Sequence, residues 1–285
     1  MRVDIGELRL FVEILGEKLA VRDGQVVEKP TIVFVHGGPA WDHLTLRVDL
    51  ESLADVAQLV FYDHRGLGRS DVSTPEDWTL TQWAADLHNL IRTLGLEKPI
   101  IFGQSFGGMV TQRFALDYPE DYSAIILAAT AARFNLPEVI ETFRRLGGEE
   151  LATIAHSFYT AADPAHRDRF LVDGFRFYTV RSPQIGVLSP FKPDVLDHFF
   201  SDAGDAHRFD YRAELQRIDA PVLVLGGEVD PVISAGAVRE LAESFRPGVA
   251  ELHIFDDCGH GPARDQPEAA LALLRNFVAK AASGA

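Results

Sequence analysis

The chain has 285 residues, of which 47% are hydrophobic and 24% charged, as is ordinary for a globular protein that buries a sizeable core. Its formal net charge of −15, from 42 acidic and 27 basic residues, argues against nucleic acid and membrane surfaces as partners, because both select basic patches. The single cysteine, Cys258, rules out an intrachain disulfide. Without an apolar leader or an apolar run of membrane-spanning length, we expect a cytoplasmic protein.

Apolar strands alternate with helices through the first part of the chain. Continuous apolar runs at 31–35 and 59–62 predict strands that are buried on both faces, as in a parallel sheet. Apolar residues at helical spacing over 80–94 predict an amphipathic helix. The other elements predicted here are a half-solvated strand at 7–15, a helix over 42–57, a strand and a helix on either side of 103–107, and a strand at 123–128.

This alternation breaks over residues 131–212. The stretch is rich in proline and aromatic residues, carries several helical patterns and no strong strand, and is too long for a structureless loop. We predict a helical cap or lid over the site, with an amphipathic surface that could pair with a second copy in a homodimer. The alternation then resumes, with strands at 221–227 and 250–255 and helices at 234–245 and 265–281.

The order of these elements predicts an α/β fold. Residues 1–130 and 213–285 would form one core domain, with a mostly parallel central sheet, right-handed crossovers and helices on both faces. Ligands of such sheets bind at the carboxyl ends of the strands. We therefore look for the site among the residues that directly follow each strand.

One such segment is Gly-Gln-Ser-Phe-Gly at 103–107, which follows an apolar run and precedes a helix-competent stretch. This is the sequence pattern of a nucleophile elbow, in which a serine sits on a sharp turn between a strand and a helix. Gly103 and Gly107 are expected where neighbouring elements approach too closely for a side chain. The pattern predicts Ser105 as a nucleophile at the positive end of the following helix.

A nucleophilic serine needs a base and a carboxylate that orients this base. Asp230 and His260 each lie just past the end of a predicted strand, and the chain order serine, acid, histidine fits a sheet-based triad. We therefore predict Ser105, Asp230 and His260 as the catalytic residues. Glu228 is the alternative acid, and Cys258 is expected to be a small packed thiol.

An oxyanion hole requires two N–H donors about 3 Å from the developing charge. One is expected from Phe106, which follows the nucleophile, and the other from Gly38, in the loop after the strand at 31–35. A glycine in this loop lets its N–H face the site without an intruding side chain. The sequence shows no cluster with metal-ligand spacing, so we expect neither a metal nor another cofactor.

Together these motifs resemble the α/β-hydrolase superfamily. The resemblance rests on His-Gly-Gly-Pro at 36–39, Asp-His-Arg-Gly-Leu-Gly-Arg-Ser at 63–70, the elbow, Gly-Glu-Val-Asp at 227–230 and Gly-His at 259–260. The first two loops are similar to those of the proline iminopeptidases and their hydrolase relatives. The resemblance implies the same triad, and it implies that Asp63 and Arg65 brace the loops at the strand ends.

The resemblance leaves the substrate open. Proline iminopeptidases usually continue the first loop as His-Gly-Gly-Pro-Gly, whereas Ala40 replaces the last glycine here. They hold the free amino group of the substrate with glutamates from a larger cap, whereas the acidic residues of 131–212 are expected on solvated helix faces.

We expect a serine hydrolase that cleaves an ester, lactone or amide bond of a small, largely apolar substrate. Proline iminopeptidase activity, carbon–carbon bond hydrolysis and a non-catalytic small-molecule receptor are the alternatives. The aromatic candidates for the pocket wall are Trp41, Phe106, Phe134, Phe177, Tyr178 and Phe199.

Overall fold

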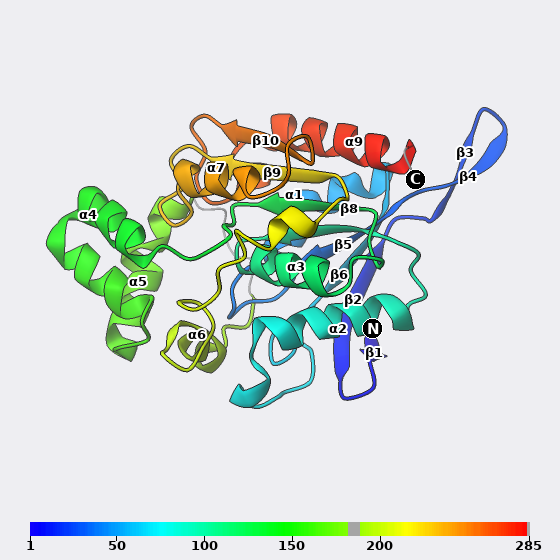
Figure 1. The fold of residues 1–285 in the computed structure, drawn as a ribbon. Helices are drawn as coiled ribbons and strands as arrows, with labels where there is room; N and C mark the ends of the chain where they lie inside the picture. Colours follow the sequence, from blue (N-terminus) through cyan, green and yellow to red (C-terminus); the bar gives the residue numbers. More distant parts are fainter. Residues whose placement is uncertain (182–188, 284–285) are drawn as a thin grey trace.

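The computed structural model describes residues 1–181 and 189–283. An eight-stranded sheet in the order β1-β2-β6-β5-β7-β8-β9-β10 forms its centre (Figure 1). The two pairings that involve β2 are antiparallel and the others are parallel, so the predicted mostly parallel sheet is confirmed. The strands are β1 (Arg2–Asp4), β2 (Arg9–Leu15), β5 (Thr31–Val35), β6 (Gln58–Tyr62), β7 (Ile100–Gln104), β8 (Ala124–Ala128), β9 (Val222–Gly227) and β10 (Ala250–Phe255).

Helices cover both faces of this sheet, and side chains along its central strands alternate between two buried faces. In β5, Val33 packs into the core shared with α2 and α3, whereas Phe34 packs into the core shared with α1 and α9. The predicted helix over 42–57 is shorter and continues as a 3-10 turn, η1. The bounds are α1 (Leu44–Leu50), η1 (Glu51–Asp55), η2 (Pro75–Asp77), α2 (Leu80–Thr93), α3 (Phe106–Asp117), η4 (Leu215–Arg217), α7 (Ala235–Glu243), α8 (Pro262–Asp265) and α9 (Pro267–Ser283).

The segment between β8 and β9 carries the predicted helices of the insertion. These are α4 (Leu136–Phe158), α5 (Pro164–Asp173), the 3-10 turn η3 (Phe175–Tyr178) and α6 (Pro193–Phe200). They lie beside the sheet, at the left of Figure 1. Gly147 and Gly148 depart from helical geometry and kink α4. Residues 182–188 of the predicted cap lie outside the described residues.

A hairpin that the sequence did not predict projects from the body of the molecule (Figure 1). It is formed by β3 (Leu19–Arg22) and β4 (Gln25–Glu28), which are joined at Asp23 and Gly24. Its strands are too short for a periodic pattern to stand out. Among the described helices, none combines the length and apolar character that a membrane crossing requires.

Candidate active site

The elbow between β7 and α3 places Ser105 on a strained turn. Its backbone has φ 54° and ψ −123°, which non-glycine residues rarely adopt and which is a feature of functional sites. A Cβ atom on Gly107 would lie 2.0 Å from the carbonyl oxygen of Val35, and one on Gly103 would lie 2.6 Å from that of Gly107. The steric role predicted for both glycines is therefore confirmed.

The structure brings the three predicted triad residues together from the ends of three strands. His260 Nε2 lies 2.9 Å from Ser105 Oγ, and His260 Nδ1 lies 2.7 Å from Asp230 Oδ2. The other carboxylate oxygen, Asp230 Oδ1, accepts the backbone N–H groups of Val232 at 2.8 Å and Ile233 at 3.0 Å. Asp230 and His260 are both buried, so their hydrogen bonds are shielded from competing water.

The loop that carries His260 is anchored to the insertion. The His260 N–H donates to the carbonyl oxygen of Tyr178 at 2.8 Å, and the Tyr178 ring packs edge-on against the imidazole at 5.1 Å between centroids. Asp265 accepts the N–H of Gly259 at 2.8 Å and the hydroxyl of Thr179. The contacts made by Tyr178 and Thr179 could not be predicted from the sequence, because they join segments about 80 residues apart whose pairing leaves no local pattern.

The two alternative reactive residues lie elsewhere. Glu228 is exposed and pairs with Arg239 at 3.7 Å, away from the imidazole. Cys258 is buried, and this burial raises the pKa of its thiol to about 12. A thiol with such a pKa is not a nucleophile at neutral pH. The geometry therefore favours Asp230 over Glu228 as the partner of His260.

Gly38 and Phe106 line the cavity next to Ser105. Phe106 is the first residue of α3, so its N–H is one of the free donors at the positive end of that helix. In the described part of the chain, neither the Gly38 N–H nor the Phe106 N–H donates to another residue. Both amides are thus placed where a substrate oxygen could accept their hydrogen bonds. Their role as an oxyanion hole stays a prediction.

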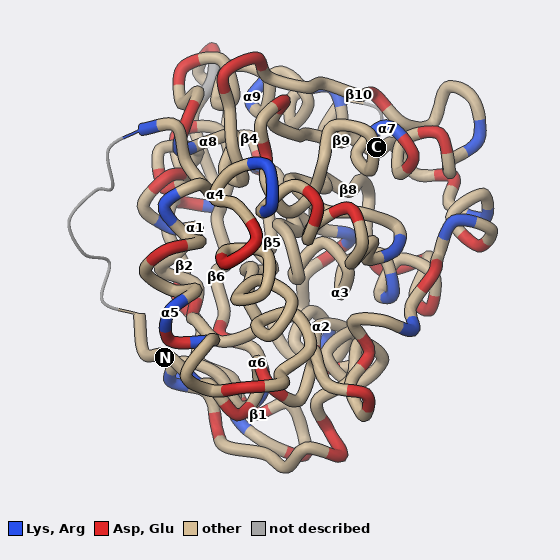
Figure 2. Tube along the Cα trace, turned by 90° about the vertical axis from the view of Figure 1, so that its left-hand side faces the viewer, with Lys and Arg blue, Asp and Glu red and all other residues tan. Residues whose placement is uncertain are grey.

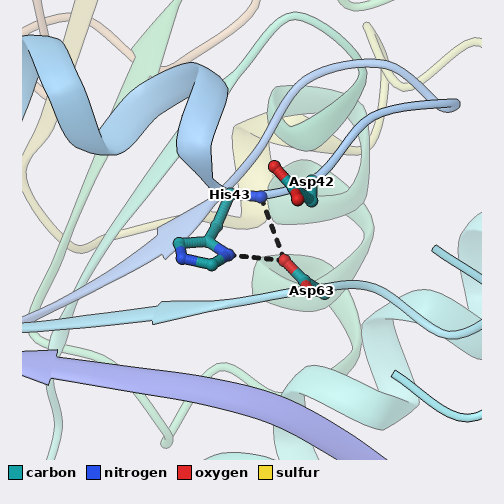
Figure 3. Close-up of side chains that lie close together, drawn as sticks. All are labelled: Asp42, His43 and Asp63. Atoms are coloured by element: carbon teal, nitrogen blue, oxygen red, sulfur yellow. Dashed lines mark hydrogen bonds and ion pairs between the residues drawn. The ribbon is translucent and has the colours of Figure 1, made fainter. Parts of the chain in front are cut away.

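A buried cluster fastens the loop before α1 to the end of β6 (Figure 3). The backbone N–H and Nδ1 of His43 both bond to Asp63 Oδ1, at 3.0 and 2.5 Å, and Nε2 lies 3.0 Å from Glu13. Burial alone would lower the pKa of His43, but the hydrogen bonds and charges of Asp63 and Glu13 outweigh it and raise this pKa.

Asp42 completes this cluster, and its ligand-type atoms lie within 4.8 Å of those of His43 and Asp63. Among residues 1–181 and 189–283, Asp42, His43 and Asp63 form the one cluster whose spacing could hold a metal ion. Hydrogen bonds to the protein already engage it, because Asp42 Oδ1 accepts the N–H of Leu44 at 3.0 Å. We therefore assign the cluster a bracing role, as the resemblance implies for Asp63.

Arg65 braces the loop after β6 from inside the protein. Its guanidinium donates twice to Asp86, at 2.8 Å each, and bonds to Asp77 and Glu7 at 3.2 Å. Although burial disfavours the charge, these carboxylates raise the pKa of Arg65 further above its ordinary value. Arg65 therefore has the structural position that the resemblance implies.

Two buried histidines lie in the loops that follow β5 and β6. His36 Nδ1 donates to the carbonyl oxygen of Gly37 at 2.7 Å, and its Nε2 accepts the N–H of His64 at 3.2 Å. Both side chains are buried, which lowers the pKa of His36 and lowers that of His64 well below its ordinary value. The His64 ring packs edge-on against Phe106 at 5.3 Å and so supports this residue from behind.

A cavity of about 560 Å³ opens at Ser105, between the strand ends and the insertion. Of the six aromatic candidates for its wall, five line it and Phe177 does not. Within the described residues, Asp49 is the one acidic side chain in the lining. The aromatic lining residues are Trp41, Phe106, Phe134, Phe158, Tyr159, Phe175, Tyr178, Phe199 and Phe200.

Comparisons with known proteins agree with this architecture. Residues 30–263 match the family model described as alpha/beta hydrolase fold. A proline iminopeptidase of Lactobacillus helveticus is 26% identical over 277 residues, covering 90% of this chain and 92% of that protein.

Solved structures give the same fold. A thermophilic esterase from Thermogutta terrifontis matches with a TM-score of 0.72 at 24% identity, covering 99% of this chain and 98% of that one. The proline iminopeptidase of Mycobacterium smegmatis matches with a TM-score of 0.76 at 19% identity, with the same coverage. The chain belongs to the α/β-hydrolase fold family and is a hydrolase, as its motifs predict.

Proposed function

We propose that this chain is a serine hydrolase that cleaves an ester, lactone or amide bond of a small, largely apolar molecule. The observation that carries the proposal is the hydrogen-bond chain from Ser105 through His260 to Asp230, which opens onto a largely aromatic cavity. In this geometry Ser105 is the nucleophile, His260 is the base that activates it, and the Asp230 carboxylate fixes the orientation of His260.

Acylation would begin with attack of Ser105 Oγ on the substrate carbonyl carbon while the Oγ proton moves to His260 Nε2. The charge that forms on the imidazole is stabilised by Asp230, whose Oδ2 holds Nδ1. The carbonyl oxygen becomes an oxyanion, which the N–H groups of Gly38 and Phe106 would stabilise. His260 then gives its proton to the leaving oxygen or nitrogen as the bond to the carbonyl carbon breaks.

Deacylation would repeat these steps with water. His260 takes a proton from a water molecule as the water oxygen attacks the acyl carbon. When this second tetrahedral intermediate collapses, the bond between the acyl carbon and Ser105 Oγ breaks and His260 returns the proton to Oγ. The acid product then leaves the cavity. No step needs a metal or an organic cofactor, because every proton is carried by His260.

The composition of the cavity wall favours a substrate with an uncharged acyl group. Nine aromatic side chains line it, and apolar and aromatic walls favour apolar ligands. The glutamates of the insertion do not line the cavity, and Glu141, Glu149 and Glu150 are largely exposed. Acidic and basic segments are interspersed on the side of the molecule that carries α4 and α5, rather than gathered in one patch (Figure 2).

Proline iminopeptidase activity is the second candidate, because the curated relative from Lactobacillus helveticus carries that name. The free amine of such a substrate would need a carboxylate, and Asp49 is the acidic lining residue available. Burial raises the pKa of Asp49, although the charge of Arg264 works in the opposite direction. The net upward shift disfavours the charged carboxylate, and the positive charge of Arg264 would repel an ammonium group, so the wall fits this substrate less well.

Matched substrates separate the two candidates. We would measure kcat/KM for p-nitrophenyl alkanoates, small lactones, prolyl p-nitroanilide and its N-acetylated form, with Ser105→Ala as the blank. The proposal predicts turnover of esters or lactones that is lost in Ser105→Ala. Turnover confined to the prolyl anilide with a free amine would support the aminopeptidase instead, and absence of turnover by folded protein would contradict both.

A further inference from the structure

Two phenol hydroxyls meet in the wall of the cavity. Tyr159, at the end of α4, and Tyr178, at the end of η3, form a hydrogen bond between their Oη atoms. Both residues line the cavity that opens at Ser105. We call them the tyrosine pair.

The tyrosine pair has two hydroxyl protons, and the hydrogen bond between the two residues uses only one of them. Each phenol is a donor and an acceptor, and the bond between them engages one proton. Among residues 1–181 and 189–283, neither hydroxyl makes a further hydrogen bond. Burial raises the pKa of both phenols, so both keep their protons at neutral pH and one O–H group is left to donate.

The surroundings of the pair are apolar. Phe158, Phe200 and Phe134 pack against the Tyr159 ring, with centroids 4.9, 5.2 and 5.4 Å away. The Phe175 ring lies 4.4 Å from the Tyr178 ring. A donor in such a wall is costly unless it meets an acceptor, and a bound ligand can supply one.

The geometry points to the tyrosine pair as a substrate-binding site for a hydrogen-bond-accepting oxygen, a carbonyl, ether or hydroxyl group in an otherwise apolar part of the substrate. This inference rests on the proposed function and narrows it, because it separates oxygenated esters from plain alkanoates. The acceptor would bind beside the catalytic base, since the Tyr178 ring lies 5.1 Å from the His260 ring.

The burial of the two residues indicates the direction of the hydrogen bonds. Tyr159 is 2% exposed and lies deeper than the partly exposed Tyr178. Either hydroxyl can donate in the bond between them, and the more exposed Tyr178 is the one whose proton can reach a ligand. The inferred arrangement thus has Tyr159 donating to Tyr178 and Tyr178 donating to the substrate. Removing the Tyr178 hydroxyl should abolish the preference for the oxygenated substrate, whereas removing that of Tyr159 should only weaken it.

The test compares p-nitrophenyl esters of 3-, 4-, 5- and 6-oxoalkanoates with the alkanoates of equal length, and hexanoate esters of oxo-alcohols with those of plain alcohols. The readout is the ratio of kcat/KM within each matched pair of substrates. The variants are Tyr178→Phe, Tyr159→Phe and the double variant, in which no buried hydroxyl loses its partner. Tyr122→Phe is the control, because it removes a buried phenol hydroxyl that bonds to Ala115 outside the cavity.

We expect at least one oxo substrate to be preferred by the wild type, with that ratio about five- to tenfold lower in Tyr178→Phe and in the double variant, as for a net hydrogen bond. Tyr122→Phe should keep the wild-type ratio. Ratios that no tyrosine variant changes would overturn the inference. Labelling of Ser105 by a fluorophosphonate reports separately on the proposed function, so a failure of the hydrolase itself would be recognised.

Discussion

The two sides of the cavity are built in opposite ways. The strand-end side is formed by the loops after β5, β7, β9 and β10 and is backed by the loop after β6. Hydrogen bonds hold its polar groups. The wall from the insertion is aromatic, with rings packed against one another and few polar groups. On the proposed function, the strand-end side carries out the chemistry, whereas the wall selects which molecule undergoes it.

The difference has a physical origin. A hydrogen bond loses most of its value when its atoms move or turn by a small amount, so the strand-end side must be held by backbone contacts. Packing of apolar rings tolerates exchange of side chains at similar volume. Substitutions on the strand-end side should therefore change rates by orders of magnitude, and substitutions in the wall should change preferences by small factors.

The largest effect is expected from Asp230→Asn. An amide keeps the shape of the side chain but no longer stabilises the charged imidazole or its correct tautomer, and kcat should fall about 10⁴-fold. The control is Glu228→Gln, two residues away, where an exposed side chain pairs with Arg239. Ester hydrolysis measures both. If Glu228→Gln lost the activity while Asp230→Asn kept it, the acid would be misassigned.

The pH dependence of stability separates two buried parts of the strand-end side. His36 and His64 have lowered pKa values in the folded state, so stability should fall as the pH decreases below about 6.5, where the unfolded chain takes up protons. His43 has a raised pKa, so its contribution is complete below that pH and is lost as the pH rises through its folded-state value. The free energy of unfolding should therefore be highest near neutral pH.

Urea unfolding between pH 5 and 9 measures both limbs. Each proton taken up on unfolding contributes a slope of up to about 1.4 kcal/mol per pH unit. His64→Gln should flatten the acid limb and His43→Gln the alkaline limb, while the exposed His253→Gln should change neither. Stability that rises steadily towards pH 5 in the wild type would contradict the assignment of neutral His36 and His64.

The smallest effect is expected in the aromatic wall. Phe175 lines the cavity, so Phe175→Leu should enlarge it and shift the preference among alkanoate esters towards longer acyl chains by about tenfold in total, as for one methylene in an apolar pocket. Phe177→Leu is the matched control, because Phe177 lies on the same 3-10 turn but outside the lining, under Arg176. Equal shifts in the two variants would show that the wall does not set chain length.

Much of the strand-end side could be predicted from the sequence because its signals are local. β7 and β9 are largely buried and mostly apolar, and Ser105 follows β7 directly while Asp230 lies three residues after β9. His260 lies five residues after β10, most of whose residues are exposed or half-buried. Gly107 is a glycine because the adjacent β5 backbone occupies the space of a Cβ atom. Strand order and chain order together then suffice to predict which side chains meet.

For the wall, the sequence predicts that aromatic residues of the insertion are candidates, but not which of them face the cavity. Phe177 was expected in the lining, but a 3-10 turn places residues three apart on one face, so Phe175 and Tyr178 face the cavity together. The contacts of Tyr178 with Tyr159 and His260 join distant segments and follow from packing alone. The division of the chain into a core and a cap, and the pairing with a second copy, stay predictions.

The most direct test of the account is the reaction of a fluorophosphonate with the folded protein, followed by intact-protein mass spectrometry. We expect a single adduct on the wild type and on Ser189→Ala, which removes the other serine hydroxyl of the lining, and none on Ser105→Ala. Labelling should be slowed by orders of magnitude in His260→Ala, because Ser105 then lacks its base. An adduct that persists on Ser105→Ala, or a folded wild type that does not react, would contradict the assignment of Ser105 as the nucleophile.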